Sequence, residues 1–160
     1  IMIRAIKILR DRLKIDCRLD IYGSGELRVQ LQQLIDELNL SSQISLNGFV
    51  ADLPAKLAES DIFLLSSSWE GFGNVLVEAL GAGLRVIATD CPSGPREILA
   101  NGKYGVLVPL DDPDAMANAI AEELNNPLAI DEFELREHLN QFTVAKIADE
   151  YLKIAQELVN

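Results

Sequence analysis

The sequence predicts an α/β fold with a doubly wound, Rossmann-like parallel sheet, and two observations lead to this fold class. Short apolar runs alternate along the chain with longer segments whose apolar residues recur every three or four positions. The run at 62–65 is apolar throughout, which is typical of a strand that is buried on both faces of a parallel sheet. The run at 62–65 stops at three serines, and a glycine turn and an apolar helix follow it. We expect this strand, loop and helix to be the unit around which the chain is organised.

The remaining elements are predicted in chain order from apolar spacing and from helix start signals. A helix is expected first, over residues 2–14, where isoleucines and leucines recur at helical spacing. Strands are expected over residues 17–22, 43–46, 62–65, 85–88 and 105–108. Helices are expected over residues 26–39, 52–58, 74–83, near 97, and over 112–125, 131–140 and 143–158. Asp52 and Asp112, each closely followed by proline, are predicted helix caps.

The apolar side of two of these helices can be read from the spacing. The helix over 26–39 is expected to bury Leu27, Leu31, Leu34, Ile35 and Leu38. The helix over 112–125 is expected to bury Ala115, Ala119, Ile120 and Leu124.

Length and charge exclude several classes of protein. A chain of 160 residues is one domain with room for a sizeable core. Its net charge of −11 argues against nucleic acid binding and against adhesion to anionic lipid by charge alone. Cys17 and Cys91 form no metal-binding spacing, so we expect free thiols in a reducing compartment. No signal peptide and no membrane-spanning run is recognisable, and a cytoplasmic location is expected.

The loop after residues 62–65 has the composition of a phosphate site. Ligands of open α/β sheets lie beyond the carboxyl ends of the strands, where this loop lies. Gly71 and Gly73 allow the backbone to approach a ligand closely. The first free amides of the following helix, at Gly73, Asn74 and Val75, are predicted to bind an anion.

Two glutamates flank these predicted amides. Glu78 is the only charge on an apolar helix, where an unpaired carboxylate is costly, and it could accept two hydrogen bonds from a ribose diol. Glu70 lies ahead of the amides and could hold a sugar hydroxyl. A sugar, a phosphate group and a ribose in this order describe a nucleotide sugar.

The residues Glu70-Gly71-Phe72-Gly73 together with Glu78 resemble the Glu-x7-Glu motif of retaining glycosyltransferases with the GT-B fold. The chain is most similar to group 1, or family 4, in its carboxy-terminal, nucleotide-sugar-binding domain. Segments 19–25, 44–50 and 94–99 agree with that family in the same order. The resemblance covers nearly the whole chain.

The resemblance implies a function and a role for each matching residue. A hexose would pass from a nucleotide diphosphate sugar to an acceptor hydroxyl with retention, in the synthesis of bacterial surface polysaccharide or lipopolysaccharide. Glu70 would be catalytic, orienting the hexose, and the donor site would comprise Glu70, Gly71, Phe72, Gly73, Asn74, Val75 and Glu78. Gly48, Phe49 and Val50 would line a base pocket, although a simple turn remains open there. No metal or other cofactor is implied.

The resemblance also implies that residues 1–160 are a fragment of a larger two-domain enzyme. The family's domain starts with a strand and a basic loop for the diphosphate, and the first strand is missing from this sequence. A saccharide or lipid-linked acceptor would be bound by a preceding amino-terminal domain. The whole enzyme could then associate peripherally with the inner face of the membrane, while this chain alone is expected to be inactive.

Several alternatives stay open from the residues. A nucleotide-sugar 2-epimerase shares the fold, and a non-catalytic nucleotide-binding module is the other rival. Trp69 either stacks on a sugar or packs, and Arg96 either touches phosphate or is paired with Glu97 or solvent. His138 is expected at the surface, and Gly23-Ser24-Gly25 is read as a tight turn.

Overall fold

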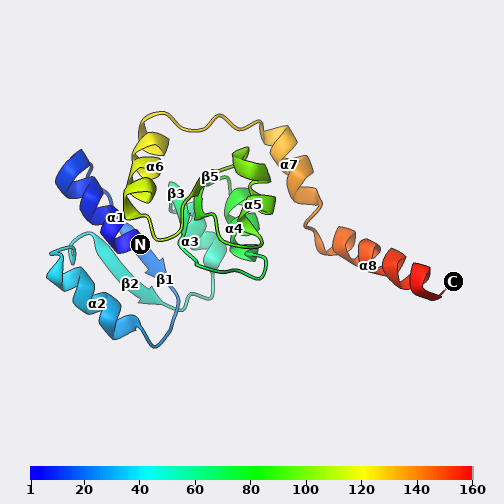
Figure 1. Ribbon diagram of the computed structural model, residues 1–160, viewed down its shortest axis with the longest axis horizontal. Coiled ribbons are helices and arrows are strands. Elements are labelled where there is room, and N and C mark those ends of the chain that lie inside the picture. The colour runs from blue at the N-terminus through cyan, green and yellow to red at the C-terminus, as the bar shows by residue number, and fades with distance from the viewer. Residues whose placement is uncertain (160) are drawn as a thin grey trace.

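The computed structural model describes residues 1–159, which form parallel β-strands flanked by α-helices (Figure 1). The strands are β1 Leu19–Tyr22, β2 Ile44–Gly48, β3 Ile62–Leu65, β4 Arg85–Thr89 and β5 Val106–Val108. Every strand pair is parallel: β1 pairs with β2, and β4 lies between β3 and β5. The predicted fold class is therefore confirmed.

The helices follow the predicted order and connect the strands. They are α1 Met2–Ile8, α2 Arg28–Glu37, α3 Leu53–Ala58, α4 Asn74–Gly81, α5 Pro95–Ile98, α6 Pro113–Asn125, α7 Glu132–Asn140 and α8 Val144–Val159. Both predicted caps are confirmed, because Asp52 accepts from the Ala55 amide at 3.1 Å and Asp112 from the Ala115 amide at 2.8 Å. In the part of the chain that the structure describes, no helix is both long and apolar enough to cross a membrane.

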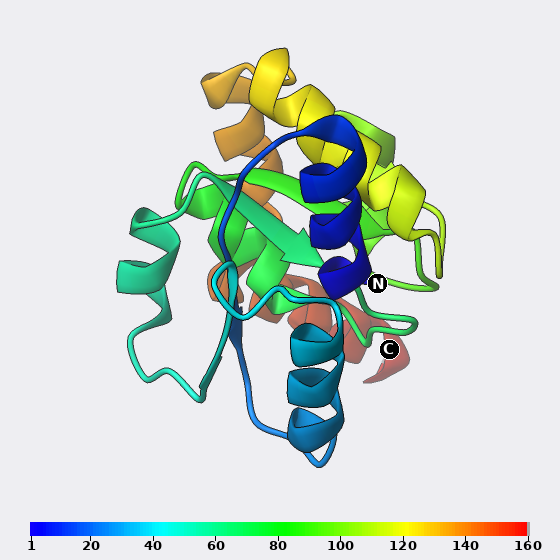
Figure 2. The same cartoon turned by 90° about the vertical axis from the view of Figure 1, so that its left-hand side faces the viewer.

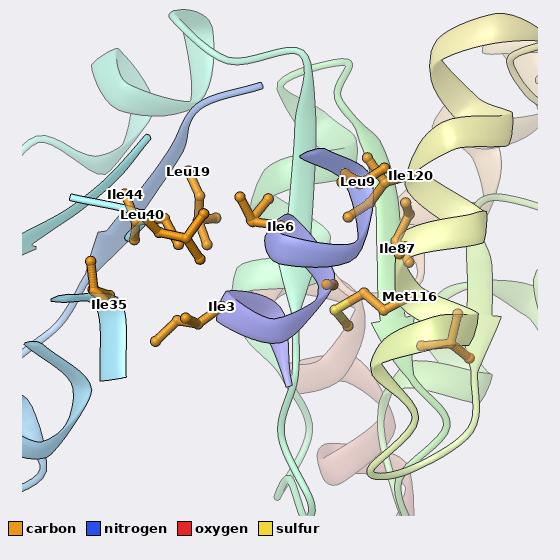
Figure 3. Close-up of a cluster of buried hydrophobic side chains, with 13 residues drawn as sticks. Ile3, Ile6, Leu9, Leu19, Ile35, Leu40, Ile44, Ile87, Met116 and Ile120 are labelled. Carbon is orange, nitrogen blue, oxygen red and sulfur yellow. The ribbon is translucent and has the colours of Figure 1, made fainter. Parts of the chain in front are cut away.

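The strands form two sheets and not one continuous sheet. Among residues 1–159, β1 pairs only with β2 and β3 pairs only with β4, so these two strands are not joined by a ladder. Instead, α1 connects the sheets through a shared apolar core (Figure 3). On one side Ile3 faces Ile35 and Ile44, and on the other side Leu9 lies near Ile87. The two sheets thus share one apolar core around α1, although no ladder joins β1 to β3.

Three predictions about individual helices are wrong. The helix over 2–14 continues past Ile8 only as a π-helical turn, η1 Leu9–Leu13, and it ends where Lys14 adopts a left-handed conformation. Leu27 precedes α2 and is 59% exposed, since the helix begins one residue later. In α6 the side chain of Leu124 is exposed and that of Glu123 is buried, accepting from the Leu128 amide.

A second apolar core holds α4 in place beneath the loop that follows β3. Leu76 and Leu80 of α4 are buried with Ile98 of α5 and Val86 of β4. The two glutamates of the predicted site are therefore carried by a helix and a loop that rest on a packed base. α7 packs against this second core, and Figure 1 shows α8 extending away from the strands. Figure 2 shows the same chain turned by 90°.

Candidate functional site

The loop that follows β3 holds Glu70 in a defined position. Glu70 is half-buried, and Ser67 Oγ donates a hydrogen bond to its Oε1 at 2.5 Å. Thr89, at the end of β4, donates from Oγ1 to the Ser67 carbonyl oxygen, also at 2.5 Å. The Glu70 carboxylate is thus connected to the sheet by two successive hydrogen bonds.

The start of α4 presents free amides, as the sequence predicts. Gly73 is the N-cap with φ of +92°, a left-handed conformation that glycine adopts without strain. The first backbone bond of the turn runs from the Leu76 amide to the Gly73 carbonyl at 2.8 Å. Within residues 1–159, the amides of Gly73, Asn74 and Val75 donate to no backbone carbonyl. Three donors at a positive helix end can bind an anion, and a phosphate group has the matching charge.

Glu78 lies one turn inside α4 and is exposed to solvent. The expectation that its carboxylate bears a burial cost is wrong, because the apolar residues Leu76, Ala79 and Leu80 turn inward and leave Glu78 on the outer face. An exposed carboxylate keeps its charge without a partner and remains accessible to a ligand. This exposed position neither supports nor contradicts the prediction that Glu78 binds a ribose.

The loop after β4 packs directly on the loop that carries Glu70. Gly94 has φ of +82°, and a Cβ added to it would lie 1.7 Å from the Phe72 carbonyl oxygen. Cys91 on the same loop is a buried free thiol. Burial raises the pKa of the Cys91 thiol, the charge of Glu70 raises it further, and the Glu70 backbone opposes the change. The two loops are therefore closely packed at Gly94 and Phe72.

Arg96 is paired with a neighbour that the sequence does not single out. Its Nε donates to Asp90 Oδ1 at 3.1 Å, and its Nη2 contacts the other carboxylate oxygen of Asp90. A pair with Glu97 was one of the open alternatives, and the structure shows Asp90 beside the guanidinium instead, because the loop turns back. The pair is exposed and adds little to stability, while it holds both ends of the loop together.

The aromatic residues of the site separate into one exposed ring and one packed ring. Trp69 is 71% exposed, so the packing alternative is excluded for its side chain. The ring of Phe72 packs edge-on against Phe142, with 5.4 Å between the centroids. Phe72 therefore connects the site loop to the turn between α7 and α8.

His138 is not a surface residue, contrary to the prediction. Its Nε2 lies 2.8 Å from the Ile98 carbonyl oxygen, and its ring packs on Tyr104 and Phe142. Since a carbonyl oxygen only accepts, Nε2 carries the proton, and Nδ1 accepts from Gln141 at 2.8 Å. The histidine therefore joins α7 to α5.

Two hollows lie beside the sheet that β1 and β2 form. One of about 440 Å³ is lined by the segment Gly23-Ser24-Gly25, by Arg28 and by Leu46. Another of about 540 Å³ is lined in part by Phe49 and Val50, and Phe49 is 82% exposed. Gly48 ends β2 with φ of +73°. The base pocket at Gly48, Phe49 and Val50 stays a prediction.

No pattern in the sequence predicts that Ser67, Thr89 or Gly94 belongs to the site. The only signal for Thr89 is a hydroxyl at the end of an otherwise apolar run, and for Gly94 a glycine beside prolines and serine. Such features are common in turns, so nothing local distinguishes these residues. Within residues 1–159, no three His, Cys, Asp or Glu side chains cluster in a way that could hold a metal ion.

Residues 1–144 match the protein family described as "Glycosyl transferases group 1". A similar relative is the N-acetylgalactosamine-N,N'-diacetylbacillosaminyl-diphospho-undecaprenol 4-alpha-N-acetylgalactosaminyltransferase of Campylobacter jejuni, 37% identical over 115 residues. That match covers 72% of this chain and 32% of the relative. The lipopolysaccharide core biosynthesis glycosyltransferase LpsE of Rhizobium meliloti is 31% identical over 137 residues, which cover 84% of this chain and 40% of LpsE.

Solved structures match over nearly the whole chain. The pneumococcal O-GlcNAc transferase GtfA, in complex with UDP and GlcNAc, has a TM-score of 0.80 and 26% identity, covering 99% of this chain and 32% of that one. A glycosyltransferase from Rickettsia africae has a TM-score of 0.86 and 24% identity, covering 99% of this chain and 44% of that one, and it supports the fold alone. The chain therefore spans between about a third and two fifths of the two relatives described above.

Proposed function

The chain belongs to the group 1 glycosyl transferases, and from this membership we propose that it binds a nucleotide diphosphate sugar and serves hexose transfer to an acceptor hydroxyl with retention. The observation that carries the proposal is the arrangement at the start of α4. Glu70 lies before the free amides of Gly73, Asn74 and Val75, and Glu78 lies one turn after them.

Each part of this arrangement suits one part of the donor. The amides at the positive end of α4 would hold the diphosphate and stabilise the charge that develops on it as the glycosidic bond breaks. Glu70, oriented by Ser67, would hold hydroxyls of the hexose. Glu78 would accept hydrogen bonds from the ribose. The proposal includes no protein nucleophile, no metal ion and no cofactor.

We further propose that this chain is the carboxy-terminal donor half of a two-domain, family 4 enzyme. The short share of each relative that it covers supports this division. The acceptor, a saccharide or a lipid-linked saccharide, would be bound by the amino-terminal half. A relative named for lipopolysaccharide core biosynthesis supports the proposal of a role in bacterial surface polysaccharide synthesis. Work at the inner face of the membrane is a further part of the proposal.

The test of this function is a transfer assay with a panel of radiolabelled nucleotide diphosphate sugars. The full-length protein and the 160-residue chain are each incubated with the same acceptor extract. We expect transfer with retained anomeric configuration by the full-length protein and none by this chain, because positioning donor against acceptor supplies about 7–11 kcal/mol of barrier lowering. Comparable transfer by the isolated chain would refute the division into halves. Epimerised free nucleotide sugar as the product would refute transfer itself.

The ribose role of Glu78 predicts a loss of nucleotide affinity in Glu78→Gln. Charge-assisted hydrogen bonds contribute about 1.5–3 kcal/mol each, so the Kd for the nucleoside diphosphate should rise about tenfold or more. Isothermal calorimetry on the full-length protein measures this change. Glu137→Gln, at an exposed position on α7, is the matched control for loss of one negative charge. If both variants bind like the parent, the ribose assignment is wrong.

A further inference from the structure

Thr89 has a buried hydroxyl group that takes no part in the donor contacts proposed above. Its side chain is 1% exposed, at the carboxyl end of β4. The ladder between β3 and β4 ends at the pair Leu65 and Ala88, one residue earlier. Beyond that pair the Thr89 hydroxyl reaches across and donates to the Ser67 carbonyl at 2.5 Å. A side chain thus continues the connection between the strands after backbone pairing has stopped.

Ser67 passes this connection on to the candidate catalytic carboxylate. Its Oγ donates to Glu70 Oε1 at 2.5 Å, and this contact does not involve the other carboxylate oxygen, Oε2. Hydrogen bonds to an ionised acceptor are the stronger kind and favour one side-chain orientation. Cys91, two residues beyond Thr89, lies close enough for the Glu70 charge to act on its thiol. The end of β4 therefore contacts the Glu70 loop through Thr89, and the segment after β4 contacts it through Gly94.

We propose that Ser67 and Thr89 are positioning residues that form a hydrogen-bond relay and hold Glu70 in the orientation needed to contact the donor sugar. This inference rests on the proposed function, in which Glu70 contacts the hexose. A catalytic group must be held within about 0.5 Å of its productive position, and a carboxylate on a glycine-rich loop has no such restraint of its own. The relay restrains Glu70 from β4, the most deeply buried strand of the sheet formed by β3, β4 and β5.

The test compares kinetics and structure of single variants of the full-length protein. In Ser67→Ala and Thr89→Val we expect kcat to fall about tenfold, while the Kd for the free nucleoside diphosphate, which lacks the sugar, stays within about twofold. Thr89→Ser keeps the hydroxyl and should restore most of the activity. Ser68→Ala is the matched control, because the Ser68 side chain is exposed and makes none of the hydrogen bonds found among residues 1–159.

A double-mutant comparison separates positioning from general destabilisation. If the relay acts through Glu70, Ser67→Ala should have little further effect on kcat in a Glu70→Ala background. An equal tenfold loss in both backgrounds would overturn the relay. If Glu70→Ala alone leaves turnover unchanged, the proposed function of Glu70 fails instead, and the two failures are distinguishable.

A crystal structure of Thr89→Val provides a readout that does not depend on activity. We expect Glu70 to lose its contact with Ser67 and to occupy more than one orientation. An unchanged Glu70 orientation would show that Thr89 does not position it.

Discussion

Replacing Glu70 by alanine in the full-length protein is expected to lower kcat for sugar transfer by roughly a hundredfold or more, with little change in affinity for the free nucleoside diphosphate. Removing one preorganised electrostatic contact to the reacting group costs about 10²–10³ in kcat in other enzymes. Glu70 is held by Ser67 ahead of the amides that would bind the diphosphate, so in the proposed function its partner would be the sugar. The diphosphate alone lacks that sugar, and its binding should therefore not change.

Transfer kinetics and calorimetry on the same preparations measure the two quantities. Glu70→Gln is the matched control, because it keeps the size of the side chain and loses only its charge, and an intermediate kcat is expected. A fall in diphosphate affinity as large as the fall in kcat would mean that Glu70 contacts the phosphate or the nucleoside and not the hexose.

The second large effect is expected on stability, from Gly94→Ala. A Cβ at this position would overlap the Phe72 carbonyl oxygen at 1.7 Å, and the backbone has φ of +82°. The overlap and the positive φ each cost about 1–3 kcal/mol, so the free energy of unfolding should fall by about 3 kcal/mol or more. The 90–94 loop and the loop that carries Glu70 would have to separate, so nucleotide binding should weaken too.

Gly102→Ala is the matched control for this variant. Gly102 also has a positive φ, of +96°, but no atom lies within 4 Å of the added Cβ. Its loss should be limited to backbone strain, about 1 kcal/mol. Chemical unfolding of both variants measures the difference. If the two variants lose the same stability, the contact between Gly94 and Phe72 does not hold the two loops together.

Much of the fold follows from local sequence features. The five strands, the caps at Asp52 and Asp112, and the start of α4 after Gly73 were all predictable. Each depends on interactions within a few residues, namely apolar period, a capping carboxylate, or the conformational freedom of glycine. The amides at the start of α4 are unpaired for the same local reason, because a helix leaves its first donors free.

The predicted helix faces were less accurate. Leu27 and Leu124 have the right spacing for a buried position, yet both are exposed, while Glu123 is buried. Spacing identifies an amphipathic face, but the exact residues that become buried depend on where the helix begins and on which neighbour it meets. Glu78 shows the same limit, since an apolar helix still has an outer side.

Sequence alone thus determined the order of strands and helices, the loop with Glu70, and the free amides beside it, since all of these arise from contacts close along the chain. The tertiary structure decided that Thr89 supports Ser67 across 22 residues, that His138 bonds Ile98 across 40, and that Gly94 lies against Phe72. These contacts join segments that only the packing of β3, β4 and α7 brings together, and no spacing in the sequence encodes them.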